Sequence, residues 1–300
     1  MLKMVKSRYI LKYIFDNITE RRTLSVIIHN KRLLEKLDIS EEEFRKFTRI
    51  EIDIQLSKES KANNLQFLNI NEDKKYYHIY LDNKEDISKR NYVKSNENIQ
   101  KISVVLEMEI KSLKGLFENC KSIESINFIK FNRNDIIDMY SMFSNCTELC
   151  DINLSLLKTK NVRDMSYMFY NCSSLYNLDI SNFNTSNVIF MNNMFSWCGN
   201  IENLELKNFN TQKVVNMNEM FYNCFSLKYL DISNFNFDKV ANMCKMFLGC
   251  ELLEDLKINL NIDKNIKIDG LFSDCSDELK NKIKNEYQDI QEEAFTMNHI

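Results

Sequence analysis

The chain has no proline and only four glycines and three histidines among its 300 residues. Loops that cradle phosphate groups need several closely spaced glycines, so P-loop and dinucleotide-binding motifs are excluded. No two histidines lie close together in the sequence, which argues against a histidine-based metal site. No nucleophile is paired with a base either. The sequence therefore predicts a protein that is not an enzyme and holds no cofactor or metal.

Long apolar runs are also missing. No stretch of 18 apolar residues occurs, so no membrane span is expected. Basic residues interrupt the apolar ones in residues 1–18, whereas a secretory signal needs an unbroken apolar stretch. We expect a cytoplasmic protein, with export to the cell surface as an open alternative.

Charge is distributed unevenly along the chain. Residues 1–50 carry 12 Lys+Arg and 7 Asp+Glu, a net charge of +5. The whole chain is at −3, so residues 51–300 are at −8. The split favours two parts with different partners. Because phosphate backbones need a basic surface, no nucleic-acid partner is expected for the acidic part.

A 26-residue repeat is the strongest signal in the sequence. Phenylalanines recur at steps of 26 residues, and of 25 at the end: Phe117, Phe143, Phe169, Phe195, Phe221, Phe247 and Phe272. A cysteine follows each of them three residues later: Cys120, Cys146, Cys172, Cys198, Cys224, Cys250 and Cys275. Stacking of such units is the arrangement of a solenoid, because each unit alone has too small a core to fold.

Each unit reads as a short strand followed by a short helix. Leu178 and Ile180 have the period-two spacing of one strand face. An apolar stripe at steps of three and four then predicts a helix: Val188, Met191, Met194, Phe195 and Cys198. Polar residues before the stripe are candidate N-caps: Asp138, Asp164, Asn216 and Asn242. Asparagines before the cysteine fit a left-handed turn at the helix end: Asn119, Asn145, Asn171 and Asn223.

Units such as residues 165–188 (MSYMFYNCSSLYNLDISNFNTSNV) resemble the BspA-like leucine-rich repeats, related to the DUF285 repeats of mycoplasma surface proteins. The resemblance covers roughly residues 110–276. It implies an α/β fold, a curved leucine-rich-repeat solenoid of strands and short helices. It also implies adhesion or protein binding without catalysis.

The N-terminal region bears a fainter resemblance. Residues 7–37 are similar to an F-box, a helical hairpin that docks on the adaptor of a cullin ubiquitin ligase, although the usual Leu-Pro opening is missing. The matching positions are Ile14, Phe15, Ile18, Leu24 and Ile28. The alternative is a helical cap over the first turn of the solenoid.

Outside the repeats, residues 49–55 and 76–81 alternate like strands, and residues 102–120 resemble a degenerate first repeat. A final helical stripe predicts a C-terminal cap: Leu279, Ile283, Tyr287 and Ile290. The predicted division is a helical F-box-like or capping region (1–50), short strands and a degenerate repeat (51–109), the solenoid (110–276) and a capping helix (277–300).

The repeated polar and sulfur-containing residues have structural readings. The cysteine column lacks the spacing of a zinc site, so we expect buried, reduced thiols. Three asparagines recur before the strand-end phenylalanine, and bonding to neighbouring turns is expected, with recognition as the alternative: Asn182, Asn208 and Asn234.

The candidate binding residues flank the inward-pointing strand positions. If Leu178 and Ile180 point inward, their neighbours project from the concave sheet. These form two columns: Asp151, Asn177, Asn203, Tyr229 and Asp255, and Asn153, Asp179, Glu205, Asp231 and Lys257. Carboxylates in three successive repeats are either a solvated acidic face or a site for a partner with a basic segment. The leading hypothesis is a protein-interaction scaffold, in its sharper form a ubiquitin-ligase substrate receptor; the alternative is a surface-exposed BspA-like adhesin.

Overall fold

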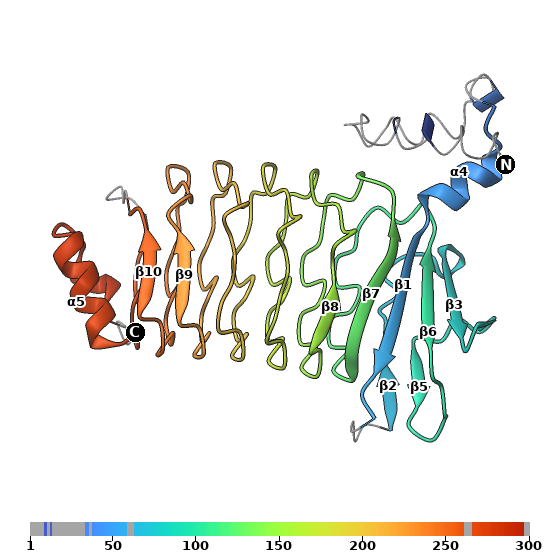
Figure 1. The fold of residues 1–300 in the computed structure, drawn as a ribbon, viewed down its shortest axis with the longest axis horizontal. Coiled ribbons are helices and arrows are strands. Elements are labelled where there is room, and N and C mark those ends of the chain that lie inside the picture. The colour runs from blue at the N-terminus through green and yellow to red at the C-terminus, as the bar shows by residue number, and fades with distance from the viewer. Residues whose placement is uncertain are drawn as a thin grey trace.

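The computed structural model describes residues 9–10, 13, 34–35, 38–58, 63–260 and 266–296. An N-terminal helix and an antiparallel sheet lead into a row of stacked coils, and a helix lies at the far end (Figure 1). The elements in chain order are α4 (Glu41–Thr48), β1 (Ile50–Leu56), β2 (Asn64–Gln66), the 3₁₀ helix η1 (Lys74–Tyr76), β3 (Tyr77–Leu81), β4 (Lys84–Glu85), β5 (Tyr92–Lys94), β6 (Ile102–Leu106), β7 (Ile123–Phe131), β8 (Asp151–Asn153), β9 (Tyr229–Ile232), β10 (Asp255–Ile258), α5 (Asp277–Glu286) and the 3₁₀ helix η2 (Glu292–Ala294).

Helix α4 begins with a capping box. The Ser40 hydroxyl accepts the N–H of Glu43 (3.1 Å), and the Glu43 carboxylate accepts the N–H of Ser40 (2.8 Å). Residues 41–43 are all glutamates, which suit the positive end of the helix dipole. On its inner side the helix buries Phe44, so both its start and its orientation follow from the local sequence.

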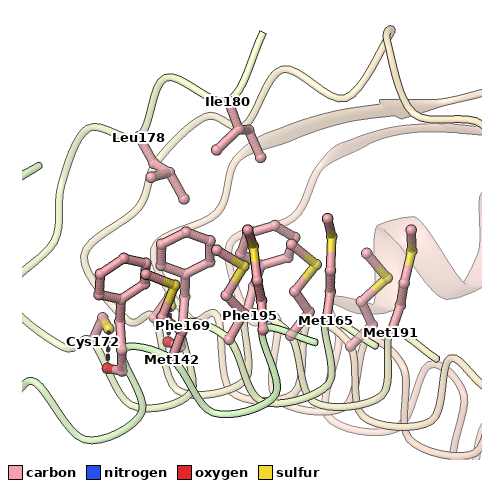
Figure 2. Packing of buried hydrophobic residues seen from close by; sticks show 14 of the residues in the cluster. Met142, Met165, Phe169, Cys172, Leu178, Ile180, Met191 and Phe195 are labelled. Atoms are coloured by element: carbon pink, nitrogen blue, oxygen red, sulfur yellow. Dashed lines mark hydrogen bonds between the residues drawn. The ribbon is translucent and has the colours of Figure 1, made fainter. Parts of the chain in front are cut away.

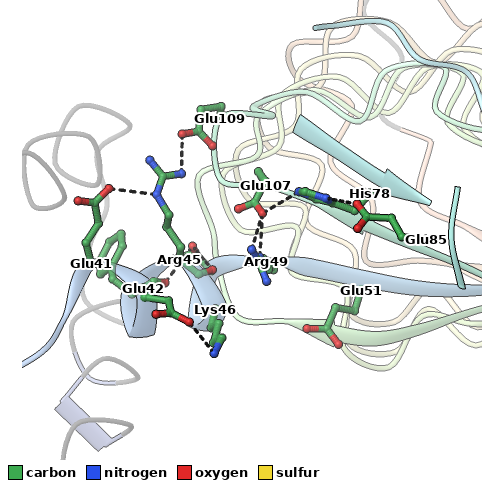
Figure 3. Close-up of polar contacts among 12 residues, drawn as sticks. Glu41, Glu42, Arg45, Lys46, Arg49, Glu51, His78, Glu85, Glu107 and Glu109 are labelled. Atoms are coloured by element: carbon green, nitrogen blue, oxygen red, sulfur yellow. Dashed lines mark hydrogen bonds and ion pairs between the residues drawn. The ribbon is translucent and has the colours of Figure 1, made fainter. Parts of the chain in front are cut away.

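Ion pairs fasten the end of α4 to the segment that follows β6 (Figure 3). Arg45 contacts Glu109, and Arg49 contacts the nearly buried carboxylate of Glu107, each at 2.8 Å. The Nε2 atom of His78, on β3, lies 3.1 Å from the same Glu107 carboxylate. The helix is thus held to the sheet by side chains from three separate parts of the chain.

The N-terminal sheet has the strand order β4-β3-β6-β1-β7-β8. β1 pairs antiparallel with both β6 and β7, whereas β7 and β8 pair in parallel. Alternate residues Ile50, Ile52 and Ile54 are buried, as the period-two pattern predicts. The strands expected at 49–55 and 76–81 correspond to β1 and β3. Residues 102–106 form β6 of this sheet, which corrects the expectation that they open a degenerate repeat.

The repeating coils begin at Leu113, whose N–H donates to the carbonyl of Asp138 in the next coil. Each coil encloses a core between two walls. We call residues 149–157 and their equivalents in later coils the sheet wall, and residues 138–146 and their equivalents the turn wall. Figure 2 shows Leu178 and Ile180 on the sheet wall, facing Phe169 and Cys172 on the turn wall. All four side chains are buried.

The short helices predicted for the repeats are wrong for the described residues, because the turn wall consists of successive turns. A helix would bond each N–H to the carbonyl four residues earlier. Here the N–H groups of Asn193, Phe195 and Trp197 instead donate to carbonyls 25 residues later, at 2.7–3.0 Å. The N–H of Met194, between two of them, closes a turn to Met191 at 3.3 Å. Alternate donors therefore join one coil to the next.

Left-handed residues shape these turns. The four asparagines expected to be left-handed all have positive φ: Asn119, Asn145, Asn171 and Asn223. A second left-handed position lies four residues earlier in each coil, for example at Ser141 (φ 53°). Gly115 (φ 58°) and Gly270 (φ 63°) occupy that second position, where glycine adopts the conformation without strain. The candidate N-caps accept N–H bonds two residues ahead of them, as turn caps without a helix: Asp138, Asp164, Asn216 and Asn242.

The phenylalanine column forms a continuous stack through the coils. Neighbouring ring centroids from Phe117 to Phe272 lie 5.3–5.8 Å apart. Asn182, Asn208 and Asn234 donate to carbonyls of the preceding coil at 2.8–3.1 Å, as expected for bonding between turns. Apolar stacking and side-chain hydrogen bonds thus reinforce the same junctions.

The column cysteines are free and buried. From Cys146 onward, each thiol donates to the carbonyl of the column phenylalanine in the preceding coil at 3.0–3.2 Å, and the bond made by Cys172 is drawn in Figure 2. Burial raises the pKa of Cys198 to about 12. A thiol that stays protonated in this way is a poor nucleophile and metal ligand.

Cys172→Ala is expected to lower the free energy of unfolding by about 1–2 kcal/mol, because it leaves a small cavity and removes the thiol hydrogen bond to the Phe143 carbonyl, which keeps the N–H of Cys146. Urea denaturation measures this loss. Cys150→Ala is the matched control, since Cys150 is half-buried and lies outside the column. Stoichiometric zinc in native mass spectrometry, or unfolding by a chelator, would contradict the structural role.

A buried arginine joins the antiparallel sheet to the first coils. The guanidinium of Arg133 is fully buried and donates to Asp135 at 2.6 and 2.8 Å. It also donates to the carbonyls of Glu107, Met108 and Ile110, at 2.8–3.2 Å. These carbonyls lie where the chain leaves β6. The Arg133 side chain therefore supplies hydrogen bonds to a bend of the backbone that is not part of a strand.

The C-terminal end is closed by α5 and the residues after it. Leu279 and Ile283 are buried against the last coil, as the apolar stripe predicts. The helix ends at Glu286, earlier than expected, and residues 291–296 return to the coil stack. The ring of Phe295 stacks on Phe272 at 5.8 Å, so the tail extends the phenylalanine column by one ring.

Candidate binding face on the sheet wall

The ten predicted binding residues lie on the sheet wall and project away from the core. Eight of them are exposed, and Tyr229 and Asp231 are half-buried. The residues between them, such as Leu178 and Ile180, are buried. The face is therefore set by strand-like alternation, although regular strands are assigned only at β7–β8 and β9–β10 within it.

Backbone pairing fixes the register at both ends of this face. In β9 and β10, Tyr229 lies opposite Asp255 and Asp231 opposite Lys257. An isolated parallel bridge joins Asn203 to Tyr229. β7 and β8 pair in the same register at the other end of the row. Where pairing is present, the two columns align as the sequence predicts.

Asp179, Glu205 and Asp231 form what we call the acidic column, and two of these three carboxylates also have a structural task. Asp179 accepts the N–H of Ser181 at 3.0 Å, and Asp231 accepts the N–H and the hydroxyl of Ser233 at 3.1 and 2.7 Å. Asn153 makes the same turn-capping bond to the N–H of Ser155. Hydrogen bonds from the serine side chain and backbone lower the pKa of Asp179 and of Asp231. Both carboxylates therefore remain charged at neutral pH.

The sequence carries a signal for these turns besides its charge. In each case an acidic or amide residue precedes a serine by two positions, with a buried aliphatic residue between them. Side chains of Asp and Asn commonly cap the N–H two residues on in this way. The motif occurs at residues 153–155, 179–181 and 231–233.

Basic side chains reach this face at its C-terminal end. The Lys257 ammonium lies 5.5 Å from the centre of the Tyr229 ring, and Lys282 of α5 lies 3.3 Å from Asp255. Lys207 lies 3.5 Å from Glu205 in an exposed pair. Exposed pairs of this kind contribute about 0–1 kcal/mol, so they leave the carboxylates accessible to other cations.

The five F-box-like positions, residues 14, 15, 18, 24 and 28, lie outside the described residues. Within the described ranges, no group of three or more His, Cys, Asp or Glu side chains is arranged to hold a metal ion. The same part of the chain contains no helix with the length and apolar character needed to cross a bilayer.

Comparison with known proteins places the coils in a family. The family model described as "Mycoplasma protein of unknown function, DUF285" matches residues 87–204, 111–228 and 176–287, which together span more than half of the chain. The chain belongs to the DUF285 family. The three overlapping matches follow the repeated coils of this DUF285 protein and also reach back into the antiparallel sheet.

Among solved structures, this DUF285 protein is similar to a leucine-rich repeat protein of T. pallidum, TpLRR. The two are 18% identical, and the similarity covers 58% of this chain and 74% of that chain with a TM-score of 0.34. No curated protein matches the chain.

Proposed function

We propose that this DUF285 protein is a non-catalytic protein-binding scaffold whose sheet wall receives a basic segment of a partner. The observation that carries the proposal is the acidic column. Asp179, Glu205 and Asp231 stand at equivalent positions of three successive coils and project from the same wall. A rigid repeat with an exposed row of side chains supports recognition of an extended partner.

Electrostatics favours a cationic partner. Adjacent coils are separated by about 4.8 Å, the spacing of neighbouring strands. Like charges at this spacing destabilise a sheet, so three carboxylates in a row carry a penalty in the free protein. A lysine or arginine side chain between them relieves that repulsion. Clustered charge of one sign also increases the rate at which an oppositely charged partner associates.

The triple variant Asp179→Asn, Glu205→Gln, Asp231→Asn tests this role. The structure at Asn153 shows that asparagine can make the turn-capping bond, so the coils should stay folded. We expect association with a lysine-rich decapeptide to slow by roughly tenfold at low salt. Surface plasmon resonance across a salt series would measure it, because salt screens exposed charges.

The control variant removes three exposed carboxylates outside the sheet wall: Asp238→Asn, Glu251→Gln and Asp274→Asn. The control has the same net charge as the test variant. A difference between their association rates must therefore come from the position of the carboxylates. An equal loss in both, or an unchanged rate in the test variant, would show that the acidic column is a solvated face. The ubiquitin-ligase role stays a prediction, since the F-box-like positions lie outside the described residues.

A further inference from the structure

A row of aromatic side chains lies on the turn wall, on the other side of the core from the acidic column. Its members, which we call the aromatic belt, are Tyr140, Tyr167, Tyr170, Trp197 and Tyr222. Ring centroids of Tyr140 and Tyr167 are 5.5 Å apart, those of Tyr167 and Tyr170 5.6 Å, and those of Trp197 and Tyr222 5.8 Å. The pairs are tilted or edge-on, so they do not form one flat stack.

The turns hold these rings outside the core. Met168 and Phe169 are fully buried, whereas Tyr167 and Tyr170 on either side of them are half-buried. Trp197 is 40% exposed. The backbone N–H of Trp197 donates to the backbone carbonyl of Tyr222 at 2.7 Å, which fixes these two residues on adjacent coils. Five large rings thus lie at a surface where the core does not require them.

The spacing of the belt follows from the repeat. Tyr170, Ser196 and Tyr222 are equivalent residues 26 positions apart, so the two tyrosines are two coils apart. At about 4.8 Å per coil, their backbone positions are separated by roughly 9.6 Å along the solenoid. A polyproline II helix repeats every three residues, or about 9.3 Å. Two residues of such a helix that lie three positions apart can therefore contact Tyr170 and Tyr222.

We propose that the aromatic belt binds a proline-rich segment of a partner protein in the polyproline II conformation. Aromatic surfaces suit this ligand because proline rings pack on them and the extended backbone has free carbonyls. Tyrosine hydroxyls and the indole N–H can donate to those carbonyls. These 300 residues contain no proline, so none of them can supply the ligand, either in the same chain or in a second copy.

Charge at one end of the belt gives the ligand a direction. The Lys114 ammonium lies 4.7 Å from the centre of the Tyr140 ring and is exposed. An acidic residue that flanks the proline-rich segment would lie near this cation. The ligand is therefore a proline-rich segment with an acidic flank at the Tyr140 end, a chemistry opposite to that of the basic segment proposed for the sheet wall.

The single tryptophan of the chain provides a direct reporter, because Trp197 belongs to the belt. The full chain would be titrated with a dodecapeptide that has proline at every third position and an acidic residue at one end. Matched peptides would place proline at every fourth position or replace proline with glycine and serine. We expect saturable fluorescence change with the first peptide and binding at least about tenfold weaker with the other two.

Variants separate the belt from the rest of the surface. Tyr170→Ala and Tyr222→Ala should each weaken binding by about tenfold, whereas Tyr176→Ala, which removes an exposed tyrosine outside the belt, should leave it unchanged. Equal binding of the three peptides would overturn the proposal even if a tyrosine variant failed to fold. So would a fluorescence response to neutral oligosaccharides but not to the peptides. The sheet-wall triple variant should bind the proline peptide normally, so the two proposals can fail separately.

Discussion

Phe195→Ala is expected to lower the free energy of unfolding by about 3–5 kcal/mol, the usual range for a fully buried phenylalanine. The side chain has no exposed surface, and its ring stacks on Phe169 at 5.8 Å and on Phe221 at 5.7 Å. Truncation removes the contacts on both sides and leaves a cavity between two coils. Because the backbone ladder holds the coils at a fixed spacing, the neighbouring rings can close that cavity only in part.

Urea denaturation followed by circular dichroism would measure the loss in Phe195→Ala. Phe195→Leu keeps most of the side-chain volume. It should destabilise the protein less than Phe195→Ala does, because it leaves a smaller cavity. Tyr176→Ala is the surface control, since Tyr176 is 65% exposed and a change there should stay within about 0.5 kcal/mol. A loss below about 1 kcal/mol in Phe195→Ala would mean that the stack relaxes freely and that the column carries little of the stability.

Arg133→Met is expected to destabilise the protein by about 3–5 kcal/mol, because it breaks a buried ion pair and leaves the other charge behind. Asp135 would keep only Lys111 as a cationic partner, at 2.7 Å. The carbonyls of Met108 and Ile110 would also lose the donor that Arg133 supplies, whereas the Glu107 carbonyl would keep the N–H of Ile110. Arg163→Met, at an exposed arginine on the coils, is the control and should be nearly neutral.

The same pair makes the stability depend on pH. Burial alone would raise the pKa of Asp135, but the charges and hydrogen bonds of Arg133 and Lys111 together outweigh burial and lower it. A folded-state pKa below the unfolded value gives stability that is complete above the ordinary carboxyl range and is lost as the pH falls below it. Arg133→Met removes most of this pH-dependent contribution, so the difference in the free energy of unfolding between the wild type and the variant should shrink as the pH falls through the carboxyl range. Identical acid-denaturation profiles for the two proteins, from fluorescence, would contradict this assignment.

Much of the coil could be predicted from the sequence because its spacing leaves few alternatives. The 26-residue period fixes which residues stack, and all the column phenylalanines and cysteines are buried. The outward positions of the candidate site follow from the same register, as at Asp231 and Lys257. Burial and register depend on which residues are apolar and how far apart they lie, and both can be read without coordinates.

The backbone path of the turn wall could not be predicted from apolar spacing alone. A stripe at steps of three and four fits a helix, but it also fits successive turns in which alternate donors bond to the next coil. The decisive signal is conformational. Left-handed residues recur four positions apart, and two of the glycines, Gly115 and Gly270, stand at the first of these positions. A helix interior does not tolerate repeated left-handed residues.

The N-terminal sheet was only partly predictable for a different reason. Its strands are clear from alternation, but their pairing joins β1 to β6 and to β7, across loops that contain further elements. Nothing local in the sequence specifies those partners. Arg133, which links this sheet to the coils, is one buried cation among 40 Lys+Arg, and its sequence neighbours do not distinguish it.

Both ends of the coil stack are covered by other parts of the chain, which affects how copies of the protein can stack and how the number of coils can change. At the C-terminal end, the N–H groups of Gly270 and Phe272 donate to the carbonyls of Glu293 and Ala294, each at 2.7 Å, so the chain's own tail occupies the donors of the last coil. At the other end, β1 covers β7. The next pairing positions at Phe272 and at β7 are thus taken by the chain itself, which opposes end-to-end stacking of copies there. The coils between the N-terminal sheet and the C-terminal segment repeat the same contacts. Gain or loss of a whole 26-residue unit would therefore change the length of the molecule and leave both terminal structures unchanged.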